Sequence, residues 1–293
     1  MKVSKLIMVV AFTAMIFGCK NQEKETTENK EAANQTAMIT AKSENIEIEG
    51  SVGTLKAVLQ TPEMVEGQKY PIVILMHGVF SNKETPLVTQ LADGLQEIGI
   101  ASLRFDFNGH GESDGKFIDM TVPLEVEDAK AVFNYANQLD FASSISLMGH
   151  SQGGVVASLL AGSLGDQVES MTLYAPAAAM EDESAAGRML GQTFDPENPP
   201  EYIEVFDHKV GREYMLTTAK LNIYSRAEKY TGPVCIVQGK KDQVVPSRYA
   251  EKYDERYQNS KLYLLEDADH VFENNVEKAA QLGIDFFNKL KTE

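Results

Sequence analysis

A serine lies at the centre of the most informative stretch of the chain, Gly149-His150-Ser151-Gln152-Gly153. This G-x-S-x-G pattern follows the short apolar run 145–148 and precedes residues 154–160, which favour a helix that begins with small residues. Between a strand and a helix, such a serine occupies a tight, strained turn and exposes its hydroxyl above the sheet. The flanking glycines fit because a side chain there would collide with the neighbouring strand or helix. The pattern predicts a nucleophilic Ser151; a structural Gly-Ser turn is the alternative.

A nucleophilic serine needs a base within hydrogen-bond reach, and the base needs a group that fixes its tautomer. In this kind of site the chain order is Ser, then Asp or Glu, then His. The chain has five histidines. His77 and His110 precede the serine, His150 is expected to face away from it, and His208 lies in a polar segment typical of a surface. His270, in a turn between a predicted strand and the last predicted helix, is therefore the expected base.

The acid is expected in the loop after the preceding strand. The apolar, β-branched run 233–237 predicts that strand, and Asp242 follows it within Gly239-Lys240-Lys241-Asp242-Gln243-Val244-Val245-Pro246. The carboxyl ends of parallel strands are where ligands bind in open sheets. A helix cap or turn is the alternative role for Asp242. Asp267 and Asp269 are nearer to His270 in the chain, and we interpret them as turn residues.

An acyl-transfer site also needs preorganised N–H donors for the oxyanion. One donor is expected to be the backbone N–H of Gln152, directly after the serine. The other is expected in the loop after the predicted strand 71–76, where Gly78 lets the backbone turn toward the serine. The N–H of Val79 is the candidate and that of Phe80 the alternative, and their side chains would line the acyl pocket.

These features resemble the α/β-hydrolases, and more narrowly the bacterial feruloyl and cinnamoyl esterases. The resemblance runs from about residue 46 to residue 291. It rests on Leu103-Arg104-Phe105-Asp106-Phe107-Asn108-Gly109-His110-Gly111-Glu112-Ser113-Asp114-Gly115, on His77-Gly78, on the run from Gly149 to Gly154 and on Tyr174-Ala175-Pro176-Ala177-Ala178. It implies an α/β fold, a mostly parallel sheet flanked by helices. It also implies Ser151, Asp242 and His270 as the catalytic triad, with Val79 and Gln152 as oxyanion donors.

The resemblance further implies a small inserted lid over the serine, here about residues 179–230, with polar side chains that hold the hydroxyl of a phenolic acid. Glu183 and Gln192 are the polar groups nearest the expected positions. Tyr202, like Tyr214, could stack on an aromatic ring or could pin the lid to the body. The lid is rich in Glu, Asp, Met and Pro, and Met180, Met189 and Leu190 make it more apolar than a hydroxyl-reading pocket requires.

The N-terminus has the features of a targeting segment. Two lysines precede the apolar stretch 6–18, which is shorter than the roughly 20 residues that span a bilayer. Cys19 directly after Gly18 resembles a bacterial lipoprotein signal; ordinary secretion is the alternative. We expect a signal peptide at 1–18, a lipidated Cys19 with a flexible polar tether to residue 45, and one hydrolase domain over 46–293. The lipid anchor would hold the protein at the bacterial cell envelope.

Composition limits the remaining possibilities. The chain has 293 residues, 43% of them hydrophobic, enough for one large α/β domain, and a formal net charge of −16. Such an acidic chain disfavours nucleic acid and charge-driven membrane binding. Cys235 lies in a predicted central strand and is expected to be buried. We expect no metal and no organic cofactor, because neither a zinc-type Cys/His spacing nor a phosphate loop occurs.

The sequence favours a serine carboxylic-ester hydrolase acting on a small-molecule ester. A serine peptidase or aminopeptidase of the same fold is one alternative, since Glu181, Asp182, Glu183 and Glu204 could bind a free amine. A noncatalytic ligand-binding lipoprotein is the other, although all three triad positions are filled. The oligomeric state does not follow from the sequence.

Overall fold

The computed structural model describes residues 37–292, which belong to one compact unit. The predicted signal peptide, Cys19 and residues 20–36 of the predicted tether lie outside the described residues. None of the helices in the described part has both the length and the hydropathy that are needed to cross a membrane.

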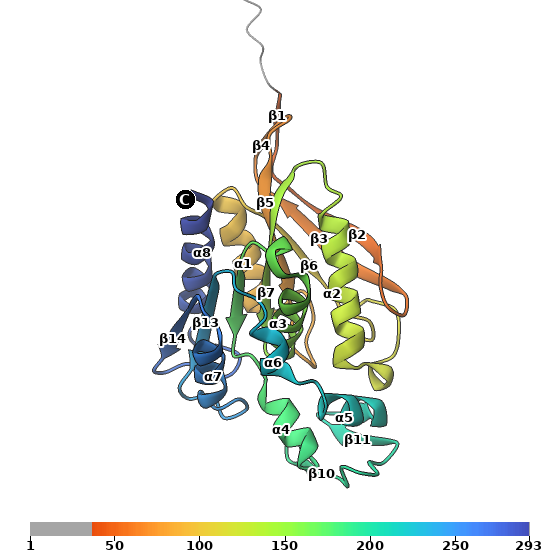
Figure 1. Cartoon of the computed structure of the whole chain (residues 1–293). Coiled ribbons are helices and arrows are strands. Elements are labelled where there is room, and N and C mark those ends of the chain that lie inside the picture. The colour runs from red at the N-terminus through yellow and green to blue at the C-terminus, as the bar shows by residue number, and fades with distance from the viewer. Residues whose placement is uncertain (1–36, 293) are drawn as a thin grey trace, which may run out of the picture. The chain divides into compact units, whose positions relative to one another are not determined.

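An eight-stranded sheet forms the centre of this unit (Figure 1). Its strand order is β14-β13-β8-β7-β5-β6-β3-β2. Every neighbouring pair from β14 to β6 is parallel, and β3 pairs antiparallel with both β6 and β2. This mostly parallel sheet with helices on both faces confirms the fold class expected from the sequence.

The strands of the large sheet are β2 (Lys42–Glu49), β3 (Thr54–Thr61), β5 (Tyr70–Met76), β6 (Ala101–Phe105), β7 (Ala142–His150), β8 (Met171–Tyr174), β13 (Val234–Gly239) and β14 (Ser260–Leu265). Three two-stranded sheets pair β1 (Met38–Ile39) with β4 (Met64–Val65), β9 (Arg188–Met189) with β10 (Gln192–Thr193), and β11 (Tyr202–Val205) with β12 (His208–Gly211). The helices are α1 (Pro86–Glu97), α2 (Val122–Ala136), α3 (Gln152–Leu164), α4 (Ala179–Ala185), α5 (Arg212–Thr218), α6 (Ile223–Ala227), α7 (Arg248–Arg256) and α8 (Val276–Thr292), with short 3-10 turns at Phe117–Asp119 and Gly165–Gln167.

Two apolar cores cover the two faces of the sheet. Buried residues of α1 and α8 pack on one face, and those of α2, α3 and α7 pack on the other. The central strands β5 and β7 contribute side chains to both cores, because successive side chains of a strand point to opposite faces. This explains why these strands read as continuous apolar runs in the sequence. Cys235 on β13 is fully buried, as its position predicts.

The segment between β8 and β13 forms a cap over one end of the sheet. It contains α4, the two small hairpins β9–β10 and β11–β12, and the helix α5, which Figure 1 shows below the strands, whereas the last helix of the segment, α6, packs beside α3. The cap corresponds to the insertion expected at about residues 179–230. Its elements are short, which accounts for the lack of a clear hydrophobic period in this part of the sequence.

The folded part begins earlier than the sequence indicates, so the predicted tether to residue 45 is too long. Met38–Ile39 pairs with Met64–Val65, and β2 begins at Lys42 and pairs with β3 as far as Lys42↔Thr61. β2 is an edge strand of the sheet, and most of its side chains are exposed. Its polar composition therefore resembles that of a tether, although the backbone is hydrogen-bonded.

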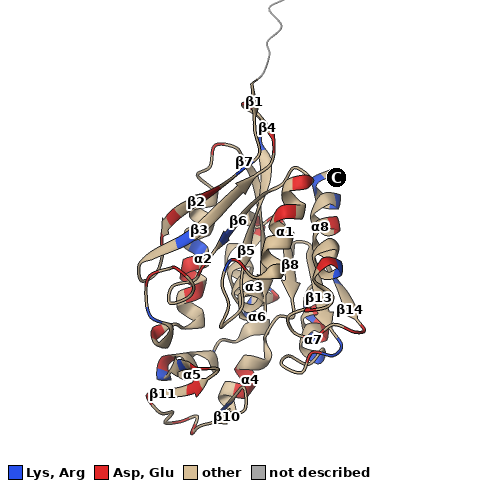
Figure 2. Ribbon diagram, turned by 180° about the vertical axis from the view of Figure 1, so that it is seen from behind, with Lys and Arg blue, Asp and Glu red and all other residues tan. Residues whose placement is uncertain are grey.

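Charged residues of both signs are interspersed along the outer helices and loops, as Figure 2 shows. Acidic residues outnumber basic ones by 43 to 27 over the whole chain. Within residues 37–292, no group of three or more His, Cys, Asp or Glu side chains is arranged to hold a metal ion.

Candidate active site

Ser151 occupies the sharp turn between β7 and α3 that the pentapeptide predicts. Its backbone is strained, with φ 54° and ψ −119°. A Cβ added at Gly149 would lie 2.1 Å from the Gly153 carbonyl oxygen, and one added at Gly153 would lie 2.3 Å from the carbonyl oxygen of His77. Only glycine therefore allows the helix to start this close to the strands. The Ser151 N–H donates to the backbone carbonyl oxygen of Tyr174 at 2.8 Å, and this hydrogen bond fixes the turn to the neighbouring strand β8.

Three side chains from separate loops meet at the carboxyl end of the sheet. The Nε2 of His270 lies 2.9 Å from the Oγ of Ser151, and its Nδ1 lies 2.8 Å from the Oδ2 of Asp242. His270 follows β14 and Asp242 follows β13. The side chain of Asp242 is fully buried and that of His270 is 14% exposed. The structure thus brings together the three residues that the sequence singles out, with the hydrogen bonds that activate a serine.

The surroundings of Asp242 favour its charged form. Its Oδ1 accepts the N–H groups of Val244 and Val245, each at 2.8 Å, and its Oδ2 accepts Gln238 Nε2 at 2.9 Å. Burial by itself would raise the pKa, but the hydrogen bond and the charge of His270, with these donors, lower the pKa of Asp242 below its usual 3.8. The carboxylate can therefore hold Nδ1–H of His270 and leave Nε2 as the acceptor for the Ser151 hydroxyl.

Two backbone N–H groups near the serine are available to an oxyanion. Within residues 37–292, the N–H groups of Gln152 and Val79 have no hydrogen-bond acceptor. The loop that carries Val79 lies against the serine, since a Cβ added at Gly78 would be 3.0 Å from the Cβ of Ser151. Phe80 follows with a positive φ of 58° and marks the point where this loop turns. The two donors expected from the sequence therefore flank the serine.

Lys83 and Asp106 anchor this loop. The Asp106 side chain accepts the Lys83 N–H and its Nζ, each at 2.7 Å, and Lys83 also pairs with Glu112 at 2.5 Å. His77, at the start of the loop, accepts the Phe107 N–H at 3.2 Å and has a pKa lowered to about 3, mainly by burial. A neutral, buried His77 agrees with the loop-organising role expected for it.

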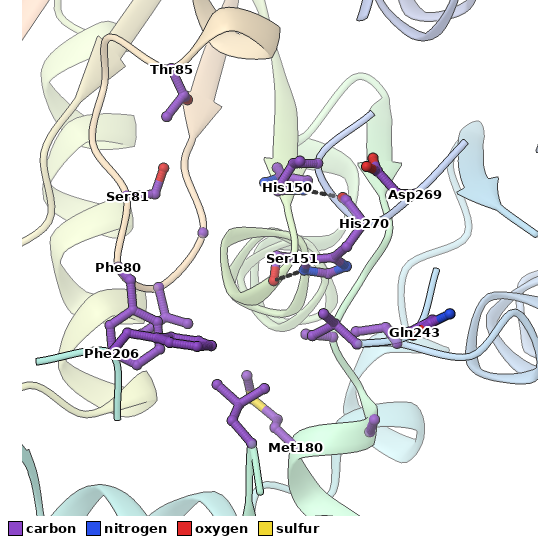
Figure 3. Close-up of a pocket in the computed structure, with 18 of the residues that line it drawn as sticks. Phe80, Ser81, Thr85, His150, Ser151, Met180, Phe206, Gln243, Asp269 and His270 are labelled. Atoms are coloured by element: carbon purple, nitrogen blue, oxygen red, sulfur yellow. Dashed lines mark hydrogen bonds between the residues drawn. The ribbon is translucent and has the colours of Figure 1, made fainter. Parts of the chain in front are cut away.

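His150 lies beside His270, and the expectation that it faces away from the site is wrong. Its Nε2 lies 2.9 Å from the carbonyl oxygen of His270, and the two ring centroids are 5.3 Å apart (Figure 3). Strand-like alternation would turn neighbouring side chains to opposite sides, but the positive φ of Ser151 interrupts it. Burial, with the neighbouring His270, lowers the pKa of His150 to about 4, so its neutral ring donates to that carbonyl and holds the loop of the base.

A cavity of about 970 Å³ opens beside Ser151 and His270. In Figure 3, Phe80 and Phe206 lie together on one side of the serine, and Gln243 lies on the other side. Met180, from the cap, lies between these two sides and below the serine in this view. Seven large hydrophobic side chains are exposed in the described part of the chain, and four of them line this cavity: Leu190, Phe206, Val244 and Val271. The site therefore has an apolar wall and an apolar rim.

The candidate substrate-binding residues are only partly brought into this cavity. Phe80 and Glu183 line it, and Glu183 is held by Arg188 through two hydrogen bonds of 3.0 and 3.1 Å. Gln192 and Tyr202 do not line it, which corrects their assignment. Gln192 is exposed on the β9–β10 hairpin, and the Tyr202 ring carries Lys209 Nζ at 4.1 Å from its centroid. The cap lacks the periodicity that would have indicated which of its faces is turned inward.

Similar proteins agree with this architecture. The family model described as "Serine aminopeptidase, S33" matches residues 67–205. Est1E from Butyrivibrio proteoclasticus, in a structure with ferulic acid bound, is 32% identical with a TM-score of 0.81, over 85% of this chain and 100% of that one. A second Est1E structure gives 29% identity and a TM-score of 0.78, over 85% and 99%.

A curated relative covers less of the chain. An uncharacterised 31.7 kDa protein of the traX-finO intergenic region of Escherichia coli is 35% identical over 88 residues, which is 29% of this chain. The match spans only 30% of that relative's own length. The identity to Est1E over its whole length, the order of the strands and the strained serine turn lead to one conclusion. The chain belongs to the α/β-hydrolase superfamily of serine hydrolases.

Proposed function

We propose that the protein is a serine carboxylic-ester hydrolase that acts through an acyl-enzyme intermediate. The observation that carries the proposal is the imidazole of His270, within 2.9 Å of the Ser151 hydroxyl and 2.8 Å of the Asp242 carboxylate. These are the three groups that a serine esterase needs, in the hydrogen-bonded order that it needs them.

The reaction begins when Nε2 of His270 takes the proton of the Ser151 hydroxyl and the oxygen attacks the ester carbonyl. The negative charge that forms on the carbonyl oxygen is stabilised by the N–H groups of Val79 and Gln152. One such donor typically lowers the activation barrier by about 2.7–4 kcal/mol. The tetrahedral intermediate collapses, and the alcohol leaves with the proton from His270. Water then gives a proton to His270 and attacks the acyl-enzyme, and the acid is released as Ser151 regains its proton.

The acyl group is proposed to be bulky and largely apolar, as a hydroxycinnamoyl group is. The cavity of about 970 Å³ next to the serine has mostly apolar walls, including Phe80 and Met180. The relative Est1E binds ferulic acid in its structure. Polar groups at the cavity, among them Glu183 with Arg188, could orient a phenolic hydroxyl.

An aminopeptidase is the second candidate, because the matching family model carries that description. Three of the four acidic residues that could bind a free amine have other partners here, and the fourth, Glu204, is exposed on β11 and does not line the cavity. Glu181 accepts the N–H groups of Asn222 and Ile223 at 2.6 and 3.0 Å, and Asp182 accepts the Tyr249 hydroxyl at 3.1 Å. These contacts favour the esterase.

The test compares turnover of methyl ferulate, short p-nitrophenyl esters and proline p-nitroanilide, together with labelling by a fluorophosphonate probe. We expect ester turnover and labelling of the wild type, and neither for Ser151→Ala or His270→Ala at a nearly unchanged melting temperature. Faster turnover of the anilide would favour the aminopeptidase. Well-folded protein that neither labels nor hydrolyses esters would favour a noncatalytic binding protein.

We also propose that Cys19 is lipidated and holds the hydrolase at the cell envelope, on the basis of the sequence pattern that precedes it. Detergent phase partitioning of the full-length protein and of Cys19→Ser, expressed in a bacterium, tests this. The wild type should enter the detergent phase and the variant should not. Equal partitioning of the two would argue for ordinary secretion.

A further inference from the structure

The side chain of Gln152, the residue after the serine, is held at both ends. Its Nε2 donates to a carboxyl oxygen of Glu125 at 2.8 Å, and its Oε1 accepts the hydroxyl of Tyr214 at 2.7 Å. All three side chains are buried, with 1% of Gln152, 2% of Glu125 and 1% of Tyr214 exposed. An amide whose donor and acceptor ends are both engaged cannot rotate without breaking a buried hydrogen bond.

The three residues come from three different parts of the fold. Glu125 lies on α2 on one face of the sheet, Gln152 begins α3 at the serine turn, and Tyr214 lies on α5 within the cap. Tyr214 also lines the cavity. The hydrogen bonds therefore run from the body of the protein through an oxyanion donor to the cap.

We propose that Glu125 and Tyr214 are positioning residues, which fix Gln152 so that its N–H points to the oxyanion and which couple this donor to the seating of the cap. This inference rests on the proposed esterase function. The reason is geometric: α3 begins at Gln152, so the orientation of that residue sets the direction of its N–H. A cap that moves away takes the Tyr214 hydroxyl with it and releases one end of the amide.

The protonation state of Glu125 bears on this role. Burial, and then the neighbouring Asp128, raise the pKa of Glu125 to about 8, against the lowering effect of the Gln152 hydrogen bond. The other groups that face it are the Tyr214 hydroxyl from α5 and, from the loop before α2, the exposed Lys116 and Asp119, which share a small cavity with it. Glu125 is thus mostly neutral at pH 7, and its ionisation would bring a negative charge close to the developing oxyanion.

The main experiment measures kcat and KM for one ester between pH 6 and pH 9.5 for the wild type and two variants of Glu125. Glu125→Ala is expected to lower kcat about fivefold to tenfold with little change in KM, since it removes a partner of Gln152. Glu125→Gln keeps an acceptor for the Gln152 amide and cannot ionise. The wild-type kcat is expected to decline near pH 8, as Glu125 ionises. Glu125→Gln is expected to have the wild-type kcat at pH 7 and to lack this decline. The matched control is Glu127→Gln, an exposed neighbour on α2.

Tyr214→Phe tests the cap end of the network. It is expected to lower kcat about fivefold to tenfold with an almost unchanged KM for a small acetyl ester, which makes little contact with the cap. Identical alkaline profiles for the wild type and Glu125→Gln would overturn the inference, as would a Tyr214→Phe protein that melts earlier but keeps its kcat. Fluorophosphonate labelling of the wild type separates these outcomes from a failure of the proposed function, in which no ester is hydrolysed.

Discussion

Replacement of Asp242 by asparagine tests the arrangement of the site most sharply, because the change removes a charge and almost no volume. Four donors face the carboxylate: two backbone N–H groups at one oxygen, and Gln238 Nε2 with His270 Nδ1 at the other. An amide has one acceptor oxygen, so its NH₂ group must face one of these pairs of donors. If it faces His270, the imidazole must accept at Nδ1 and carry its proton on Nε2, where it cannot take the serine proton.

The expected loss in kcat for Asp242→Asn is on the order of 10⁴, the size of effect known for a triad histidine in the wrong tautomer. At about 1.4 kcal/mol for each factor of ten, this corresponds to between about 5 and 6 kcal/mol of barrier. The opposed donors should also destabilise the fold by about 1–3 kcal/mol. The loss of rate therefore exceeds anything that the loss of stability could produce below the melting temperature.

The assay is steady-state hydrolysis of a p-nitrophenyl ester, with a thermal melt of each protein. Asp269→Asn is the matched control, because Asp269 adjoins His270 and lines the same cavity, but its carboxylate accepts only the Glu273 N–H among residues 37–292. It is expected to keep kcat within a few fold. An Asp242→Asn protein within tenfold of the wild type, or an Asp269→Asn protein that is the more impaired, would refute the assignment of the acid.

Three further predictions concern the cavity, the turn and the response to pH. Phe206→Ser, at an exposed rim position, should raise KM for bulky aromatic esters about threefold to tenfold and leave acetate esters unchanged; an equal effect on both would contradict a role in acyl recognition. Gly153→Ala should destabilise the protein by about 1–3 kcal/mol or more, since its Cβ would lie 2.3 Å from the His77 carbonyl oxygen, and denaturant titration measures this; an unchanged midpoint would contradict that close approach. Burial lowers the pKa of His77 to about 3 and the pKa values of His110 and His150 to about 4, so these rings stay neutral in the folded state while the unfolded chain binds protons below about pH 6.5. Stability should therefore fall as the pH decreases from 6.5 toward 4, and a midpoint of urea unfolding that stays constant over this range would contradict it.

The sequence predicts the central part of this molecule well. The apolar runs of β5, β7 and β13 are long and bounded by turns, and the glycines around Ser151 mark a close approach of strand and helix that few other motifs require. The order Ser, Asp, His then restricts the choice of partners to Asp242 and His270. Each of these inferences depends on local pattern or on chain order, which a single sequence contains.

The sequence does not predict contacts between segments that have no local signal. The side chain of Glu125 suits the first turn of a helix, and only the packing of α2 against α3 reveals that it is buried beside Gln152. Resemblance alone places Gln192 and Tyr202 at the cavity, and the short hairpins of the cap turn them elsewhere. Tyr214 does carry a signal, since the sequence singles it out, with Tyr202, as a tyrosine that could pin the lid to the body.

The outermost strand has a consequence for anyone who prepares this protein without its N-terminal segment. Residues 42–45 pair with positions 58–61 of β3. A recombinant version that starts at residue 46 would leave without partners those backbone N–H and C=O groups at that end of β3 that face β2, whereas β6 still pairs with the other side of β3. The freed groups would be open to a strand from another molecule. Charged side chains on β2, such as Lys42, Glu44 and Glu47, normally discourage that pairing. Purification should therefore begin from a chain that retains residue 37, and the shorter version should aggregate at concentrations where the longer one stays monodisperse.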